Sequence, residues 1–309
     1  MKLTDTIFTD ATKAREHLEK TRWANGTYCP HCGGLNVTKL EGKAARPGTW
    51  QCNMCRGQFT VTVGTVFERS KVPLNKWLLA TYLVASSKKG ISAHQIGRQL
   101  GVTYKTAWFM MHRIREAMRS DDTTPFGSGG GGVEVDETFI GKDTDAKPSK
   151  MAIRNMCKVV SLIDRDTGRS RSVVVDDLRP DTLWQVVSAN VSREANLITD
   201  EASHYKPMGR EFASHKWVSH AQDEYVSFSD PSVHTQTVEG FFSVFKRGMK
   251  GIYQHCGKQH LHRYLAEFDF RYSNRSALGC EDSERANRLL ISIAGKRLTY
   301  RRTGEACYA

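Results

Sequence analysis

The sequence lacks a long apolar run and an apolar leader. Its longest apolar-looking stretch, residues 77–85, is interrupted by Thr81 and Tyr82. That is far shorter than the roughly 20 residues that a membrane-spanning helix needs. The opening residues 1–19 are polar and contain no core of a signal peptide. We therefore expect a cytoplasmic protein with no membrane partner, in which the eight cysteines do not form a disulfide framework.

The larger part of the chain also lacks a net charge. Residues 121–309 hold 26 basic and 26 acidic side chains, so the net charge of +12 lies in residues 1–120, which hold 19 basic and 7 acidic ones. Within the neutral part, residues 121–240 are acidic, with 13 basic and 20 acidic side chains. The first 120 residues are therefore predicted to contact a polyanion such as DNA. The acidic middle can also face DNA if metal ions neutralise its carboxylates.

Two Cys-x-x-Cys motifs lie near the start of the chain. Cys29 and Cys32 form the first, Cys52 and Cys55 the second, and 19 residues separate the two. Two thiolates at this spacing can bind one ion from a single turn, and two such turns complete a tetrahedral Zn²⁺ site. Because all four ligands are sulfur, the predicted zinc ribbon is structural rather than catalytic. Redox-active pairs or unliganded thiols are the alternatives.

Three helices are predicted next, at 74–87, 92–100 and 103–118. Ser92 is the expected N-cap of the second helix, and Gly101 is expected to end it. A short helix, a tight turn and a longer basic helix are typical of a helix-turn-helix. A three-helix packing unit with an ordinary charged surface is the alternative. The DNA-contacting residues predicted on the third helix are Lys105, Arg113 and Arg115.

Residues 121–132 contain Pro125 and five glycines and are predicted to be a flexible linker. A chain of 309 residues is long enough for two or three domains. We therefore expect a multidomain protein with an N-terminal helix and zinc ribbon at 1–70, a helix-turn-helix at 71–120, the linker, an α/β domain at 133–280 and a basic C-terminal tail at 281–309.

Residues 133–140 alternate apolar and polar side chains and predict a strand with Asp136 at its centre. A carboxylate in a buried strand is costly unless it is paired, hydrogen-bonded or bound to a cation. Asp136 is therefore a candidate metal ligand, and a solvated place on an edge strand is the alternative. Strand alternation points the neighbouring Glu137 to the opposite face.

The segments that follow predict a mixed sheet with helices. A hairpin turn joins strands at 157–164 and 170–175, a helix follows at 180–190, and a short strand at 196–200 ends in Asp200. Further on we expect a helix from residue 201 and a short strand around 217–218. Residues 234–250 have apolar residues at helical spacing and predict an amphipathic helix.

This last helix carries several charged candidates. Glu239 and Lys246 are seven positions apart and lie on one side, where a carboxylate and an ammonium can act together on a phosphodiester. A solvated polar stripe is the alternative. Arg247 and Lys250 are further predicted DNA contacts.

Four stretches together resemble a group of bacterial insertion-sequence transposases: Val-Asp-Glu-Thr-Phe-Ile-Gly-Lys at 135–142, Thr-Asp-Glu at 199–201, His-Thr-Gln-Thr-Val-Glu-Gly-Phe-Phe-Ser-Val-Phe-Lys-Arg-Gly at 234–248, and the segment 258–272. The resemblance implies an N-terminal zinc ribbon and a ribonuclease H-like DDE catalytic domain at 133–280. It implies Asp136 and Asp200 as the catalytic aspartates, Glu239 as the third acid and Lys246 as the associated lysine. Some members carry asparagine in the region of Glu239, and the neighbouring Glu137 and Glu201 are rivals.

The implied reaction is two-metal phosphoryl transfer that cleaves and joins double-stranded DNA at the ends of an insertion sequence. Oxygen ligands from three carboxylates suit Mg²⁺ or Mn²⁺. The resemblance also implies a homo-oligomer on DNA, because such transposases generally act on paired ends. A metal-dependent nuclease without strand transfer and a catalytically silent zinc-ribbon regulator are the alternatives.

Overall fold

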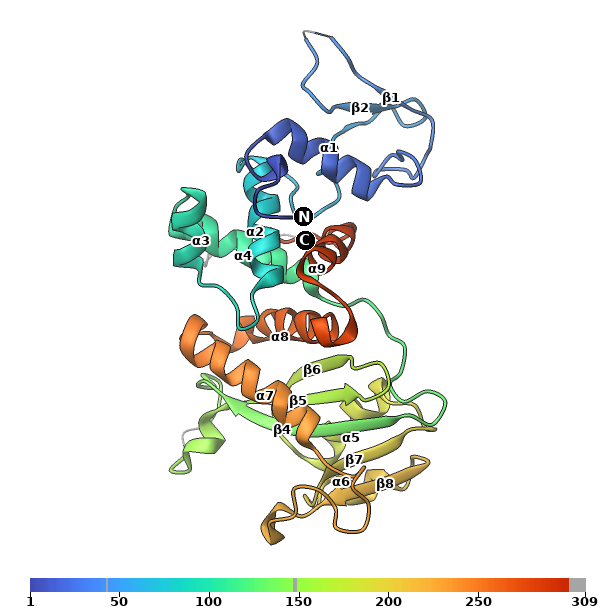
Figure 1. Ribbon diagram of the computed structural model, residues 1–309, viewed down its shortest axis with the longest axis vertical. Coiled ribbons are helices and arrows are strands. Elements are labelled where there is room, and N and C mark those ends of the chain that lie inside the picture. Colours follow the sequence, from blue (N-terminus) through green and yellow to red (C-terminus); the bar gives the residue numbers. More distant parts are fainter. Residues whose placement is uncertain (43, 147–148, 300–309) are drawn as a thin grey trace. The chain divides into compact units, whose positions relative to one another are not determined.

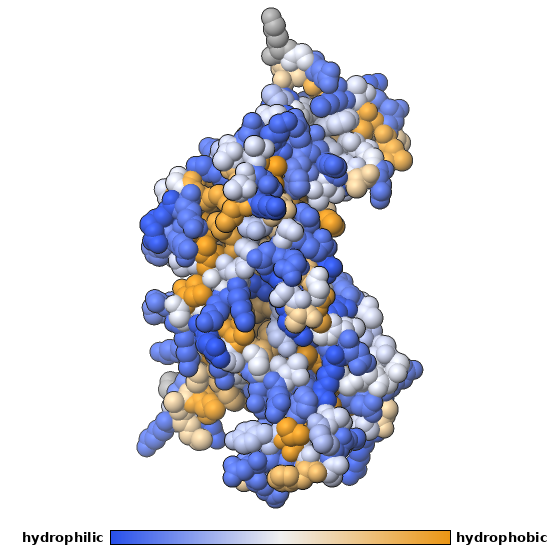
Figure 2. Space-filling view, in the orientation of Figure 1, coloured by the Kyte–Doolittle hydropathy of each residue, from blue (hydrophilic) through white to orange (hydrophobic). Residues whose placement is uncertain are grey.

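The computed structural model describes residues 1–42, 44–146 and 149–299, and the chain forms two compact units (Figure 1). The ribbon–helix unit comprises Met1–Ser87, Ile91–Met118 and the described residues of Cys280–Ala309. The sheet unit comprises Lys88–Gly90 and Arg119–Gly279. Hydrophilic residues make up most of the visible surface (Figure 2). Among the described residues, no helix is both long and apolar enough to cross a bilayer.

The ribbon–helix unit begins with helix α1 (Ala11–Arg22), which Asp10 caps by accepting the backbone N–H groups of two first-turn residues. A three-stranded antiparallel sheet follows, with β1 (Val37–Lys39), β2 (Trp50–Cys52) and β3 (Gln58–Phe59) in that order. Trp23, at the end of α1, packs edge-on against Trp50 and Phe59, with ring centroids 5.7 and 6.0 Å apart. These aromatic contacts join the small sheet to α1.

Three further helices lie close to their predicted positions: α2 (Leu74–Ser86), α3 (Ala93–Leu100) and α4 (Tyr104–Met118). The Ser92 hydroxyl accepts the backbone N–H of Gln95, as expected of an N-cap. Gly101 ends α3 in the left-handed conformation, at φ 61°, which favours glycine. The local capping signals were therefore sufficient to place this helix.

Helix α9 (Asp282–Ile291) corrects the predicted C-terminal tail. Its apolar side, which includes Leu289 and Leu290, is buried, and the helix packs against α1 and α2. Arg285 is also buried and donates to the carbonyl oxygen of Ala85 on α2. Residues 282–291 are thus part of the ribbon–helix unit, because their helical apolar stripe needs a partner. Residues 300–309 of the predicted tail lie outside the described part of the chain.

Arg113 and Arg115 on α4 are buried, which does not fit their predicted contact with DNA. The Arg113 guanidinium donates to the carbonyl oxygens of Leu298 at 3.1 Å and Glu68 at 3.0 Å, inside the ribbon–helix unit. Its burial also lowers the pKa of Arg113. The sequence pattern indicated that these side chains are positively charged, but it could not indicate whether they point into the unit or toward solvent. Lys105, by contrast, is exposed near the start of α4.

The sheet unit contains a five-stranded mixed sheet in the order β6-β5-β4-β7-β8 (Figure 1). β4 pairs antiparallel with β5, and β5 pairs antiparallel with β6. On its other side β4 pairs in parallel with β7, which pairs in parallel with β8. The predicted mixed sheet is confirmed, and its strands are β4 (Gly132–Ile140), β5 (Cys157–Asp164), β6 (Ser170–Val175), β7 (Asn196–Asp200) and β8 (Ser214–Val218).

Helices cover both faces of this sheet. On one face, Val133 and Val135 belong to an apolar cluster with α5 (Pro180–Asn190) and α6 (Tyr205–Gly209). On the other face, Ile140 belongs to a cluster with α7 (Gln236–Gly248) and α8 (Lys258–Ser273). The short π-helical turn Met249–Tyr253 follows α7 directly. With helices on both sides of β4, its polar residues Glu134 and Thr138 are buried, and Asp136 and Glu137 are half-buried.

Residues 126–132 correct the predicted flexible linker. Phe126 is buried in the cluster beneath α5, and the Gly127 N–H donates to the Asp164 carboxylate at 3.2 Å. Gly127 has φ +70°, and a Cβ atom there would lie 2.5 Å from the Ala195 Cβ. These glycines provide a left-handed turn and a close approach to the sheet. Amino-acid composition indicated flexibility, because it cannot distinguish a glycine in a flexible linker from one that a tight turn or a close backbone contact requires.

Candidate active site

The strand register brings two of the predicted acids to one face of the sheet. Glu134 of β4 pairs with Ile198 of β7, and two residues further along these parallel strands come Asp136 and Asp200. Steps of two residues keep the same face of a strand. That face is covered by α7, because the backbone N–H of Val238 donates to the Glu134 carboxylate at 2.9 Å. The next residue of α7 is Glu239, so all three predicted acids approach the same side of the sheet.

The acids also act on one another electrostatically. Burial and the nearby charge of Glu137 raise the pKa of Asp136 to about 8, and Asp200 and Glu239 add to the shift. Burial likewise raises the pKa of Asp200, with contributions from Glu137 and Glu201. Asp136, Asp200 and Glu239 are each half-buried, and partly desolvated carboxylates placed near one another repel unless a cation neutralises them. This donor set of hard oxygen atoms fits Mg²⁺ or Mn²⁺.

Glu239 is held by two residues that the sequence analysis did not identify. The Thr235 hydroxyl donates to Glu239 Oε1 at 2.9 Å, and His220 Nε2 lies 3.4 Å from the same oxygen. Glu239 itself stays half-buried at the start of α7. A threonine four residues before a glutamate at a helix start is a signal that could have been used, whereas His220 comes from a segment without periodicity.

The basic residues of α7 occupy its second half. Lys246 lies two turns after Glu239, and its ammonium is 6.0 Å from the centre of the Phe242 ring. Arg247 and Lys250 are exposed. Lys246 and Arg247 lie in the last turn of α7 and Lys250 in the π-helical turn that follows, where positive charge complements the helix dipole.

The two rival glutamates have structural partners. Glu137 lies on the opposite face from Asp136, where it accepts a hydrogen bond from the Tyr205 hydroxyl at 2.5 Å. Glu201 accepts the backbone N–H groups of His220 and Ala221 at 2.7 and 3.0 Å. Glu137 and Glu201 thus hold neighbouring segments of the chain in place. Asp136, Asp200 and Glu239 are called the acid cluster below.

A buried ion pair fixes the start of α7. Glu134 is fully buried and accepts the Arg165 Nε–H at 2.6 Å while it accepts the α7 backbone N–H of Val238. Arg165 also donates to the carbonyl oxygens of Ser232 and His234, just before the helix. The Glu134 side chain, two residues before Asp136, thus helps to fix the start of α7, the helix that carries Glu239.

Arg165→Ala is expected to destabilise the sheet unit by about 3 kcal/mol, because it leaves the buried Glu134 carboxylate without its cation. Urea unfolding at neutral pH measures this loss. Arg179→Ala is the matched control, since its pair with Asp177 is exposed and its loss should leave stability nearly unchanged. An equal small loss in both variants would contradict the proposed clamp on α7.

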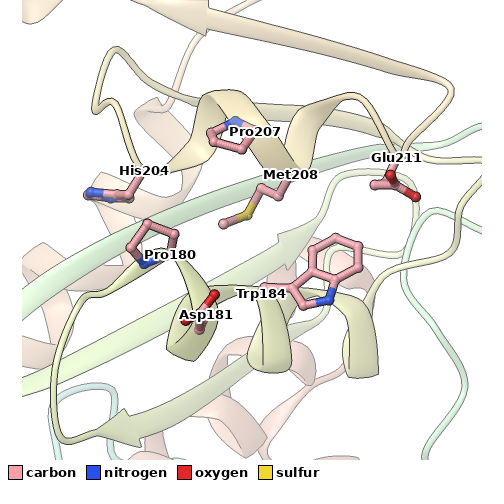
Figure 3. A pocket seen from close by; sticks show the side chains of 7 residues that line it. All are labelled: Pro180, Asp181, Trp184, His204, Pro207, Met208 and Glu211. Atoms are coloured by element: carbon pink, nitrogen blue, oxygen red, sulfur yellow. The ribbon is translucent and has the colours of Figure 1, made fainter.

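The face of the sheet unit opposite the acids has a separate cavity of about 390 Å³ between α5 and α6. Pro180, Trp184, Pro207 and Met208 supply its apolar walls, and His204 lies at one side (Figure 3). His204 Nε2 is 3.3 Å from Glu137, so this cavity borders the supporting residues but none of the three acids.

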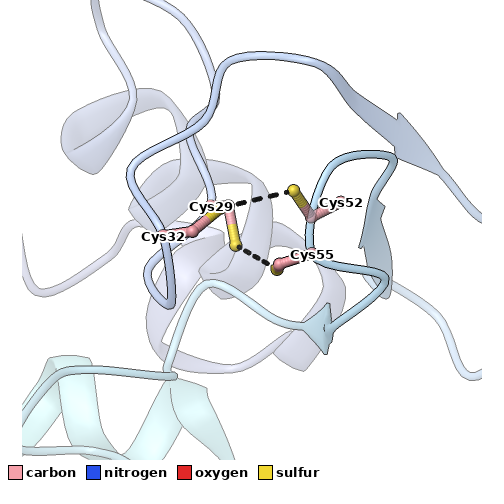
Figure 4. A group of neighbouring side chains, drawn as sticks. All are labelled: Cys29, Cys32, Cys52 and Cys55. Carbon is pink, nitrogen blue, oxygen red and sulfur yellow. Dashed lines mark hydrogen bonds between the residues drawn. The ribbon is translucent and has the colours of Figure 1, made fainter.

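The four predicted zinc ligands converge in the ribbon–helix unit. The Sγ atoms of Cys29, Cys32, Cys52 and Cys55 all lie within 4.8 Å of one another (Figure 4). Cys29 and Cys55 are 3.7 Å apart at sulfur and Cys32 and Cys52 are 3.6 Å apart, well beyond a disulfide bond but suited to a tetrahedral zinc site. Within the described residues, the carboxylates of the sheet unit are not gathered this tightly.

Two family profiles match the chain. Residues 9–58 match the transposase zinc-ribbon domain, and residues 129–273 match the ISXO2-like transposase domain. The chain belongs to the insertion-sequence transposases. This transposase is also 28% identical over 281 residues to an uncharacterized protein in transposable element ISH50 of Halobacterium salinarum. That alignment covers 85% of the transposase and 91% of the relative, so the similarity extends through both units.

Proposed function

We propose that this transposase cleaves and joins DNA strands at the ends of an insertion sequence, with Asp136, Asp200 and Glu239 as ligands of catalytic Mg²⁺ or Mn²⁺. One observation carries the proposal: neighbouring parallel strands present two aspartates on the face from which α7 presents a glutamate. A sheet with three antiparallel strands followed by two parallel ones, covered by helices on both faces, also supports a ribonuclease H-like assignment for this unit.

Three carboxylates from separate elements offer enough oxygen ligands for a pair of divalent ions. When bound, two divalent cations would activate the attacking hydroxyl and stabilise the departing oxygen of a phosphodiester. The chain contributes three carboxylates from separate elements and keeps them oriented through Thr235 and the Glu134–Arg165 pair. Lys246 supplies positive charge toward the DNA phosphates, and its loss is expected to reduce activity less than the loss of an aspartate.

The ribbon–helix unit is proposed to deliver the DNA. It contains the zinc ribbon, and α3 and α4 form a helix-turn-helix in which the exposed Lys105 contacts double-stranded DNA. The excess of positive charge in the first 120 residues supports this role, because it attracts the phosphate backbone. Arg247 and Lys250 are proposed contacts near the acids. A homo-oligomer would hold two DNA ends together.

An assay with purified protein, labelled DNA carrying the element ends, a target plasmid and Mg²⁺ tests this function. The DNA that flanks the coding region supplies the end sequences. We expect labelled ends joined to the plasmid. Cleavage without joining would favour a metal-dependent nuclease, and binding without cleavage would favour a DNA-binding regulator.

A further inference from the structure

The sheet unit exposes its Phe, Tyr and Trp rings within one short segment. Among its described residues, the exposed rings are those of Trp217 (48%), Tyr225 (56%) and Phe228 (86%). Trp217 lies on β8, the strand at one edge of the sheet, and the other two lie between β8 and α7. Exposed apolar groups that gather in this way mark a binding surface. Residues 217–228 are called the aromatic segment below.

The exposure of Phe228 does not result from a loosely held backbone. Its N–H donates to Glu224 Oε1 at 3.0 Å, and the other Glu224 oxygen accepts the N–H of Ser219 at 3.3 Å. Two residues before Phe228, Val226 pairs with His234 in an antiparallel bridge. These hydrogen bonds thus hold the backbone around Phe228 in place, and the ring remains exposed to solvent.

The aromatic segment is tied to the acid cluster. The Tyr225 ring centroid is 5.2 Å from that of His220, and His220 Nε2 is 3.4 Å from Glu239. The N–H of His220 also donates to Glu201, the residue after Asp200. A DNA strand with a phosphate at the acids therefore passes close to the Tyr225 ring.

A cavity of about 340 Å³ lies beside one of these rings, that of Trp217. Trp217 forms part of its wall, and Lys216, Ser227, Ser229 and Asp230 supply hydrogen-bonding groups. Its volume is at the lower end of the roughly 300–1,000 Å³ found for small-ligand sites. An aromatic wall with a few polar groups is the combination that recognises a nucleobase outside a duplex.

We propose that the aromatic segment binds unpaired nucleobases of the DNA substrate by stacking. Every base has a flat face, so stacking on aromatic side chains tolerates any sequence. In an intact duplex those faces are covered by neighbouring base pairs, whereas a strand end that cleavage releases can leave its partner strand. This inference rests on the proposed function, in which the neighbouring acids cleave DNA. The segment would hold the bases next to the reacting phosphate.

The test measures affinity rather than activity. Full-length protein is titrated into a dye-labelled oligothymidine of about 20 nucleotides and, separately, into a labelled duplex of about 20 base pairs. The buffer contains EDTA and about 0.2 M salt, which weakens contacts to phosphate. Phe228→Ala and Tyr225→Ala are each expected to weaken single-strand binding about 10-fold and to change duplex binding less than about twofold. Phe228→Trp is expected to retain the affinity. Leu278→Ala, at an apolar residue of the same unit that is 40% exposed, is the matched control.

Unchanged single-strand affinity in both alanine variants would overturn the proposal, as would an equal loss on both forms of DNA. An altered sedimentation coefficient with unchanged DNA affinity would also overturn it, because the rings would then belong to a protein interface. The outcome is separable from the proposed function. Stacking fails independently if the wild-type protein cleaves DNA but the variants bind single strands normally, and the proposed function fails independently if single-strand stacking is found without any cleavage.

Discussion

Asp136→Asn is expected to reduce metal-dependent DNA cleavage at least about 1,000-fold while DNA binding stays within about twofold of the wild type. Asparagine keeps the size of the side chain and an oxygen that can accept the Glu137 N–H, as Asp136 does at 2.7 Å. It removes the negative charge that the proposed divalent cations would require. Cleavage of labelled end DNA in Mg²⁺ and in Mn²⁺, together with a gel-shift measurement in EDTA, separates catalysis from binding.

The same substitution has a second expected effect on stability. Burial and neighbouring carboxylates raise the pKa of Asp136 from 3.8 to about 8, so at neutral pH the unfolded chain releases a proton that the folded chain keeps, and this carboxyl group lowers stability increasingly as the pH rises between those two values. Its removal is expected to raise Tm in EDTA by about 2–4 °C, as about 1 kcal/mol would in a unit of this size. Asp181→Asn, at an exposed residue of α5, is the control and should change neither property. Cleavage at wild-type rate by Asp136→Asn would exclude the assigned role.

Cys52→Ser is expected to eliminate zinc binding and to disorder the ribbon sheet. Cys52 is buried at the end of β2, and serine oxygen is a far poorer zinc ligand than a thiolate. Because binding of a structural zinc ion contributes directly to folding, its loss should also weaken DNA binding at least about 10-fold. Metal analysis of the purified variant by mass spectrometry measures the zinc content per chain.

Cys256→Ser provides the matched comparison for this prediction. Cys256 is half-buried in the sheet unit and lies outside the sulfur cluster. It should retain one zinc ion per chain and wild-type DNA affinity. Full zinc occupancy in Cys52→Ser would show that the four cysteines do not form one metal site.

Local patterns predicted the sheet unit well, because its strands carry their signals in adjacent residues. The alternation around Asp136 and the turn at 165–168 placed β4, β5 and β6 at the observed residues. Helix α4 shows the limit of such patterns. Its position followed from caps and spacing, but the burial of Arg113 depends on carbonyl groups of Glu68 and Leu298, which are distant in the sequence.

The candidate site was likewise predicted in part: its acids were predicted, and the residues that support them were not. The three acids were predicted from motifs, and the strand register and α7 explain in physical terms why they share a face. Their supports were missed because Tyr205 and His220 lie outside any periodic pattern and reach the site only through tertiary contacts. Glu134 was visible only as a polar residue in a strand, and its pairing with Arg165 could not be read from either segment alone.

The position of α9 has a consequence for synthesis of the chain. The ribbon–helix unit is formed by the first part of the chain together with the described residues after 279, so the main part of the sheet unit, Arg119–Gly279, is inserted between them. During translation, α1 and α2 leave the ribosome long before the helix that packs against them. Synthesis of the sheet unit is therefore complete before α9 is made. A chain released before that point leaves the apolar surface of α1 and α2 uncovered.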